Sequence, residues 1–186
     1  MKIMIITSSP NDDGLTATCG IQAKTGVELG NANALIVSLN SLNISSCHAC
    51  GTAWGTCRSE HSCQVQDDFQ KLHAEMVEAD AYIIITPVYW GDMSESLKAF
   101  IDRLRRCEAT NGDKNNLAGK PFICVAAPGG TGNGCISTLS SFERFVDHVK
   151  GIKYDFIGVT QRNREYKLTT IKDAAKSMAT SLNNLK

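Results

Sequence analysis

The sequence predicts an α/β domain with a doubly wound parallel sheet of five strands and helices on both faces, in three layers. Two observations lead to this fold class. Five short apolar, β-rich runs recur along the chain, and helix-like segments separate each run from the next. Strands connected through helices run parallel. The chain has 186 residues, enough to bury a sizeable core, so we expect residues 1–186 to form a single domain.

The strands are expected at residues 2–7, 34–39, 81–86, 121–127 and 153–160. The first four are almost continuously apolar, which is typical of strands buried on both faces. The helices are expected at residues 15–29, 67–79, 94–106, 136–149 and 169–185. Gly30 follows the first helix as a plausible C-cap, and Cys124 is expected in the core.

Charge and hydropathy exclude several classes of protein. Lysine plus arginine equals aspartate plus glutamate at 19 each, which argues against a nucleic-acid binder and against a strongly acidic electron carrier. No apolar run approaches the roughly 20 residues that span a bilayer, and the run from Ile3 to Ile6 is too short for a signal-peptide core. We therefore expect a cytoplasmic protein, in which the eight cysteines stay reduced.

A phosphate site is predicted at the first strand-to-helix loop, residues 8–16, because ligands bind beyond the carboxyl ends of parallel strands. The loop is rich in hydroxyl groups and leads into a helix, whose first N–H groups attract anions. Ser9, Asn11 and Thr16 can donate further hydrogen bonds, and Asp12 and Asp13 are expected to point into solvent. The alternative is that these polar residues only cap the helix.

Two further loops at the same edge of the sheet can line a flat ring. After the third strand, Tyr89 and Trp90 precede Gly91, which lets backbone N–H groups approach a ring closely. The alternative is that the two aromatic residues pack on the core or at a subunit contact. After the fourth strand, the glycine-rich residues 126–134 leave room for a ring edge. Neither a nucleotide P-loop nor the Rossmann glycine motif occurs in the sequence.

Two of these loops resemble motifs of the NAD(P)H-dependent FMN reductases and iron–sulfur flavoproteins, which have a flavodoxin-like fold. Residues 8–16, SSPNDDGLT, resemble the S-P-R-x-x-G-N-T loop that binds the FMN phosphate, with Asn11 and Leu15 in place of its arginine and asparagine. Residues 86–106, TPVYWGDMSESLKAFIDRLRR, resemble the segment that lines the flavin ring. The residues implied to bind FMN are Ser8, Ser9, Asn11, Gly14, Leu15, Thr16, Pro87, Val88, Tyr89, Trp90, Gly91, Pro128, Gly129 and Gly130.

A cysteine-rich insertion, residues 40–66, interrupts the alternation of strands and helices. Its four cysteines, Cys47, Cys50, Cys57 and Cys63, can hold a [4Fe–4S] cluster or a zinc ion, or can pack over the flavin as free thiols. Zinc is disfavoured, because zinc sites usually separate their cysteine pairs by more residues. Iron–sulfur flavoproteins carry a similar compact run of four cysteines, but the insertion of residues 51–56 displaces the third one here.

The resemblance implies an oxidoreductase in which NAD(P)H, the co-substrate, delivers hydride to FMN. The flavin then passes electrons to a quinone, free flavin, nitro compound or metal ion, or to an internal cluster. Because the flavin performs the chemistry, no side chain is predicted as a general acid or base. One alternative is a flavin or iron–sulfur electron carrier that is reduced by ferredoxin. A weaker one is a regulatory module without cofactor. A homodimer or homotetramer is expected, with no nucleic-acid or membrane partner.

Overall fold

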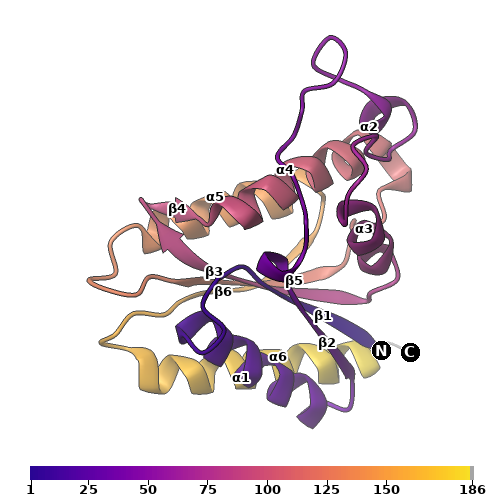
Figure 1. Cartoon of the computed structure of the whole chain (residues 1–186). Helices are drawn as coiled ribbons and strands as arrows, with labels where there is room; N and C mark the ends of the chain where they lie inside the picture. Colours follow the sequence, from indigo (N-terminus) through magenta and orange to yellow (C-terminus); the bar gives the residue numbers. More distant parts are fainter. Residues whose placement is uncertain (185–186) are drawn as a thin grey trace.

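The computed structural model describes residues 1–184 and has the expected three-layer α/β architecture (Figure 1). The parallel strands are in the order β2-β1-β3-β5-β6, which is the flavodoxin-like order with its switch point between β1 and β3. A short sixth strand, β4, pairs antiparallel with β3. The strands are β1 (Lys2–Thr7), β2 (Asn33–Ser38), β3 (Ala81–Tyr89), β4 (Asp92–Met93), β5 (Pro121–Ala127) and β6 (Ile152–Gly158).

Helices α1 (Leu15–Leu29) and α6 (Arg164–Asn183) cover one face of the sheet (Figure 1). The other face carries α3 (Phe69–Val77), α4 (Glu95–Glu108) and α5 (Cys135–His148). The last helix begins at Arg164 instead of residue 169, and its expected end at residue 185 lies outside the described residues. Residues 1–184 also form three short helices, η1 (Leu39–Ser41), α2 (Thr56–Ser59) and η2 (Ala109–Lys114).

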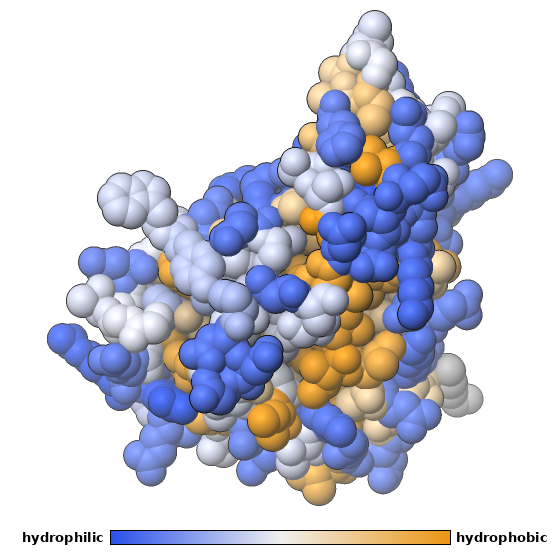
Figure 2. All heavy atoms as spheres, in the orientation of Figure 1, coloured by the Kyte–Doolittle hydropathy of each residue, from blue (hydrophilic) through white to orange (hydrophobic). Residues whose placement is uncertain are grey.

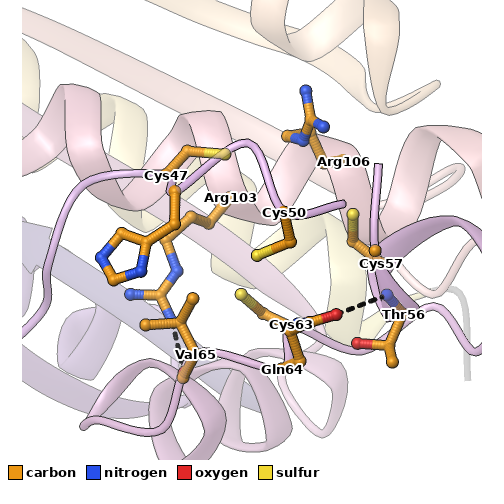
Figure 3. A pocket seen from close by; sticks show the side chains of 11 residues that line it. Cys47, Cys50, Thr56, Cys57, Cys63, Gln64, Val65, Arg103 and Arg106 are labelled. Carbon is orange, nitrogen blue, oxygen red and sulfur yellow. Dashed lines mark hydrogen bonds between the residues drawn. The ribbon is translucent and has the colours of Figure 1, made fainter. Parts of the chain in front are cut away.

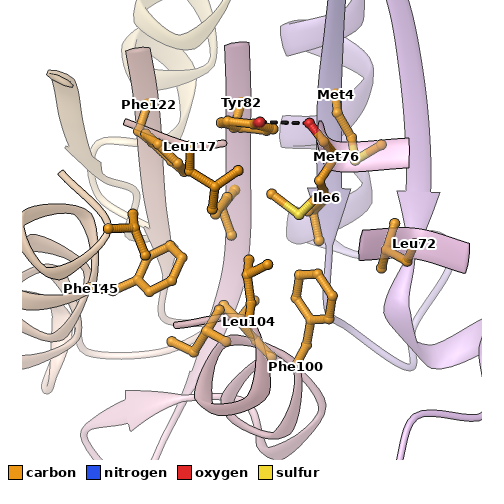
Figure 4. Packing of buried hydrophobic residues seen from close by; sticks show 14 of the residues in the cluster. Met4, Ile6, Leu72, Met76, Tyr82, Phe100, Leu104, Leu117, Phe122 and Phe145 are labelled. Carbon is orange, nitrogen blue, oxygen red and sulfur yellow. Dashed lines mark hydrogen bonds between the residues drawn. The ribbon is translucent and has the colours of Figure 1, made fainter. Parts of the chain in front are cut away.

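Alternating side chains of the central strands supply two cores. Ile3 and Ile5 of β1 face α1 and α6, whereas Met4 and Ile6 face the opposite layer. In that layer, Phe100 and Leu104 of α4 pack near Met4, Ile6 and Tyr82 (Figure 4). The sequence pattern of strands buried on both faces is therefore confirmed for the strands in the middle of the sheet.

Strand β2 departs from this pattern, because it is an edge strand that pairs only with β1. Its residues are exposed or half-buried, and Ile36 is 39% exposed. The expectation that this strand is buried on both faces was therefore wrong. In the orientation of Figure 1, Figure 2 shows apolar atoms at the surface in the middle of the view. The cysteine-rich insertion projects above them. No helix among residues 1–184 is long and apolar enough to cross a membrane.

Two glycines let α1 and α6 approach closely. A Cβ atom on Gly26 would lie 2.1 Å from the Lys172 carbonyl oxygen, and one on Gly30 would lie 2.6 Å from the Ala179 Cβ atom. Gly30 is also the C-cap of α1, as expected. These contacts fix α1, whose N-terminus is the candidate phosphate site, against the rest of the domain.

Candidate functional site

The N-terminus of α1 is uncapped. Gly14 is the N-cap residue and has no side chain to accept a hydrogen bond, and the first helical bond runs from the Thr18 N–H to the Gly14 oxygen at 3.0 Å. The backbone N–H groups of Leu15, Thr16 and Ala17 have no partner among the described residues. The alternative was that the polar side chains of the loop only cap the helix. The part of the chain that the structure describes has no such capping hydrogen bond at the start of α1. An uncapped helix start suits an anion.

Side chains of the loop before α1 use their acceptor atoms internally. The Asn11 N–H donates to Ser9 Oγ at 3.1 Å, and the Asp13 N–H donates to Asn11 Oδ1 at 3.2 Å. The Ser9 hydroxyl and the Asn11 amide NH₂ group therefore still have hydrogens to donate to a ligand. Ser8 is buried, and its hydroxyl donates to the Ile85 oxygen of β3 at 3.4 Å, so it anchors the loop.

An open cavity of about 210 Å³ lies beside this loop, between α1 and the edge of the sheet. Ser9, Asn11 and Thr16 line it, as does Asp12. Asp12 and Asp13 are both exposed, as expected. The cavity thus brings three of the predicted phosphate ligands together beside the uncapped helix. The part of the loop that faces it contains no lysine or arginine, so its potential donors are neutral.

The segment after residue 86 is a β-hairpin, where the sequence predicted the end of the third strand and a loop after it. Strand β3 continues to Tyr89, which pairs with Asp92 of β4. The two residues between them, Trp90 and Gly91, have φ angles of 50° and 83°. Two left-handed residues are typical of a type I′ hairpin turn. Trp90 is fully exposed and Tyr89 is 41% exposed, so packing of both rings on this chain's own core is not observed.

The glycine-rich segment after β5 lies against this hairpin. A Cβ atom on Gly134 would lie 2.4 Å from the Gly91 Cα atom, and the Ser137 hydroxyl donates to the Gly91 oxygen. Pro128 is buried, while Gly129 and Gly130 are exposed and have open space around them. Strands β1, β3 and β5 are neighbours in the sheet. The three predicted loops therefore follow adjacent strands at one edge of the sheet.

The four cysteines of the insertion line a single small cavity (Figure 3). The cavity lies between the insertion and α4, encloses about 20 Å³, and is also lined by Arg103 and Arg106. All four thiols are free. Within residues 1–184, no three Cys, His, Asp or Glu side chains are placed to hold a metal ion together. A zinc ion would require such a close set, with Zn–S distances of about 2.3 Å, so the described residues form neither a zinc site nor a preformed cluster site.

The remaining cysteines lie in the fold outside this cavity. Cys124 is fully buried in the core, as expected. Burial raises the pKa of Cys19 and of Cys107 to about 12, which makes these thiols poor nucleophiles and ligands. Sequence reasoning missed Arg103 and Arg106 as residues of the cysteine cavity. Their spacing of three places them on one helix face, but the sequence gives no sign that this face meets the insertion.

Comparison with known proteins identifies the family. The family model described as NADPH-dependent FMN reductase matches residues 1–153. An iron–sulfur flavoprotein of Methanocaldococcus jannaschii is 28% identical over 130 residues, 70% of this chain and 65% of that protein. One of Archaeoglobus fulgidus is 30% identical over 123 residues, 66% of this chain and 58% of that protein. The chain thus aligns with less than two thirds of the length of these two relatives.

Solved structures share the fold at low sequence identity. A flavone reductase has a TM-score of 0.79 and 16% identity, covering 100% of this chain and 64% of its own. An NAD(P)H:quinone oxidoreductase from Methanothermobacter marburgensis has a TM-score of 0.74 and 18% identity, covering 96% of both chains. These structural similarities show a flavodoxin-like fold. The match of the family model to residues 1–153 shows the family as well. The chain belongs to the NADPH-dependent FMN reductase family.

Proposed function

We propose that this protein is an FMN-dependent oxidoreductase that passes electrons from NAD(P)H to a small acceptor. The observation that carries this proposal is the position of three loops at the carboxyl ends of the adjacent strands β1, β3 and β5, the first of which leads into an uncapped helix. Bound FMN would accept hydride from a nicotinamide and release the electrons to the acceptor, while the protein binds and orients it. The family and the quinone oxidoreductase among its structural neighbours support this reaction class.

The phosphate of FMN would be held by the free N–H groups at the start of α1 and by Ser9, Asn11 and Thr16. Each of these side chains lines the cavity beside the loop. The acceptor oxygens of Ser9 and Asn11 already accept hydrogen bonds within the loop, so their hydrogens are free to bind a ligand. A doubly charged phosphate needs donors, and hydrogen bonds to a charged group are worth about 1.5–3 kcal/mol each. The neutral donors together replace the arginine that the family motif carries at the position of Asn11.

The flavin ring would lie between the β3–β4 hairpin and the glycines after β5. Residues 87–91 would form one wall, and Gly129 and Gly130, which have open space around them, would leave room at the other. Backbone N–H groups of the glycine segment could then donate to the ring edge and favour its reduced, more negative form. Water access to this edge remains wide, because Trp90 and Tyr89 are exposed. An exposed ring face suits transient stacking of a nicotinamide and a small planar acceptor such as a quinone.

Two measurements test this function. Calorimetry with FMN should show binding at one site per chain, and riboflavin, which lacks the phosphate, should bind much more weakly. Anaerobic mixing of the FMN-loaded protein with NADH or NADPH should then bleach the flavin absorbance within seconds. If FMN binds but only reduced ferredoxin bleaches it, the protein is an electron carrier and the reductase proposal is wrong. Failure to bind FMN would favour a module without cofactor.

We further propose that Cys47, Cys50, Cys57 and Cys63 bind a [4Fe–4S] cluster. Four thiols on one cavity provide one ligand for each iron, and relatives of this chain are named iron–sulfur flavoproteins. As folded, the cavity of about 20 Å³ has room for about one water molecule, so the insertion must widen to take up a cluster. Iron and acid-labile sulfide assays after anaerobic purification should give about four of each per chain, and their absence would refute this proposal.

A further inference from the structure

Arg103 is buried beneath the cysteine insertion and joins its two ends. Its side chain is 1% exposed. One terminal nitrogen, Nη1, donates to the Ser45 oxygen at 3.0 Å, and the other, Nη2, donates to the Val65 oxygen at 2.9 Å. Ser45 lies two residues before Cys47, and Val65 lies two residues after Cys63. A single guanidinium therefore fixes both stems of the cysteine-bearing segment.

Asp67 completes the base of the segment. Its Oδ2 atom accepts from Arg103 Nη1 at 2.7 Å and from the Ser45 N–H and hydroxyl at 2.9 and 2.8 Å. Burial alone would raise the pKa of the Asp67 carboxyl, but hydrogen bonds from Arg103, Ser45 and Phe69 hold it well below its usual range. The carboxylate is thus charged at neutral pH, and the buried guanidinium has the counter-charge that it needs.

Arg106, on the same face of α4, contacts the inserted residues 51–56. Its guanidinium carbon lies 3.9 Å from the centre of the Trp54 ring, and its Nη2 atom donates to the Ala53 oxygen. These contacts hold the insertion back against α4. Cys57 follows directly and faces the same cavity as the other three cysteines. The extra residues therefore do not remove the third thiol from the set.

Both arginines carry a buried Nε–H group without an acceptor among the described residues. Both side chains also line the cavity of the four thiols (Figure 3). A buried donor without a partner is costly, and such groups are rare in proteins. The two groups on one cavity are therefore available to an acceptor that occupies it, whether a water molecule or a ligand. Four thiols line the same cavity, and an iron–sulfur ligand that they held would place its own sulfur atoms beside these donors.

We infer that Arg103 and Arg106 are positioning residues that hold the four thiols together and donate their Nε–H groups to sulfur atoms of the bound cluster. This inference rests on the cluster proposed above. Hydrogen bonds to cluster sulfurs and nearby positive charge favour the reduced cluster, which carries one more negative charge. The two arginines therefore set the reduction potential of the cluster as well as its geometry.

The test compares the wild type with Arg106→Gln, Arg106→Lys, Arg103→Lys and the control Arg105→Gln. Arg105 lies on the same helix, outside the cavity, and pairs with Asp102 at 3.7 Å. Anaerobic redox titration followed by electron paramagnetic resonance gives the midpoint potential of each variant. Arg106→Gln should disfavour the reduced cluster at least tenfold, a shift of about 59 mV to more negative potential for a one-electron couple. Arg106→Lys should shift it less, and Arg105→Gln should match the wild type.

Measuring the iron content distinguishes failure of this inference from failure of the proposal that the four thiols bind a [4Fe–4S] cluster. A wild type without iron and sulfide overturns the cluster and the role of the arginines together. A wild type with a cluster, but with the same potential in Arg106→Gln, Arg103→Lys and Arg105→Gln, overturns the role of the arginines alone. Arg103→Lys keeps the charge but loses the planar fork, so it should also lower the iron content severalfold. The Arg106 variants keep the test decisive if Arg103→Lys does not fold.

Discussion

The flavin edge and the cysteine pocket are constructed in different ways. The flavin edge consists mainly of backbone: free N–H groups at the start of α1 and glycines after β5, placed by the order of adjacent strands. The cysteine pocket consists of side chains from an insertion, held by the buried Arg103 and by Arg106. Backbone sites are fixed by topology, whereas the pocket depends on a few side-chain contacts. The two should therefore respond differently to substitution, and the following predictions test this difference.

The largest effect is expected at the base of the insertion. Asp67→Asn leaves the Arg103 guanidinium buried without a counter-charge, which typically costs about 3–5 kcal/mol. Urea unfolding should show this loss in the free energy of unfolding. The adjacent Asp68→Asn is the control, because the Asp68 carboxylate accepts an exposed hydrogen bond, from the Asn43 N–H at 2.7 Å. If the folded Asp67→Asn protein also lost FMN affinity, the two regions would not be independent.

A smaller effect, confined to the flavin edge, is expected from Thr16→Val. The substitution keeps the shape of the side chain and removes a hydroxyl that lines the cavity by α1. The affinity for FMN should fall about 10- to 100-fold, because a hydrogen bond to a charged group is worth about 1.5–3 kcal/mol. Calorimetry with riboflavin should show no change. Thr25→Val, farther along the same helix, is the control, and an equal loss there would contradict a phosphate contact.

The packing of α1 offers a test of the scaffold beneath the flavin edge. Gly26→Ala places a Cβ atom 2.1 Å from the Lys172 oxygen of α6. We expect a loss of about 1–3 kcal/mol in the free energy of unfolding, as for other overpacked sites. Thermal unfolding measures it. The iron content of the cysteine pocket should stay at the wild-type level, since α1 and the insertion lie on opposite faces of the sheet (Figure 1). A parallel loss of iron would argue against separate regions.

The hairpin turn should show the smallest effect of substitution. Asn followed by Gly is a preferred type I′ pair, so Trp90→Asn should keep the turn and relieve part of a left-handed strain of roughly 1–3 kcal/mol. FMN affinity should fall only about 2- to 12-fold, because aromatic stacking contributes about 0.5–1.5 kcal/mol. Fluorescence titration with FMN measures this. Trp90→Phe should retain most of the affinity, and unchanged affinity in both variants would remove Trp90 from the flavin site.

Mild acid should leave both regions intact. The folded-state pKa of Asp67 is lowered, so its contribution to stability is complete above the unfolded-state pKa, about 3.9. It is lost as the pH falls from there toward the folded-state value. The difference in free energy of unfolding between the wild type and Asp67→Asn should therefore be constant between pH 5 and 8. It should shrink below about pH 4. A difference that shrank near pH 6 would implicate another group.

Sequence reasoning reached the fold class and the three loops because both depend on local patterns. Apolar runs indicate the strands. The loops are recognised by the residues that follow each strand, such as Gly14 after β1 and Gly91 after β3. It missed that β2 is half exposed, because an apolar run does not reveal which strand lies at the edge. It also missed the hairpin, since a tryptophan in the left-handed region at Trp90 runs against the usual turn preferences. Its FMN ligands remain predictions.

The pocket arginines were missed for a different reason. Arg103 lies in a motif that was read as a flavin segment, yet its side chain contacts residues 58 positions earlier, at Ser45, and 38 positions earlier, at Val65. Contacts of such separation come from the tertiary arrangement of α4 and the insertion, and no local pattern encodes them. The contact between Arg106 and Trp54 could not be predicted for the same reason. Trp54 lies in the irregular insertion, which has no periodicity to show which of its side chains face the protein.

The attachment of the insertion at Ser45 and Val65 has a consequence for how its length can vary. With both ends tied to one guanidinium, residues can be added or removed at the exposed part between them, residues 51–53, while the two anchor points keep their places. The entropy of closing a loop grows only slowly with length, by about 0.6 kcal/mol for each doubling. The exposed part of the segment can thus differ in length between proteins that keep the same two anchor points.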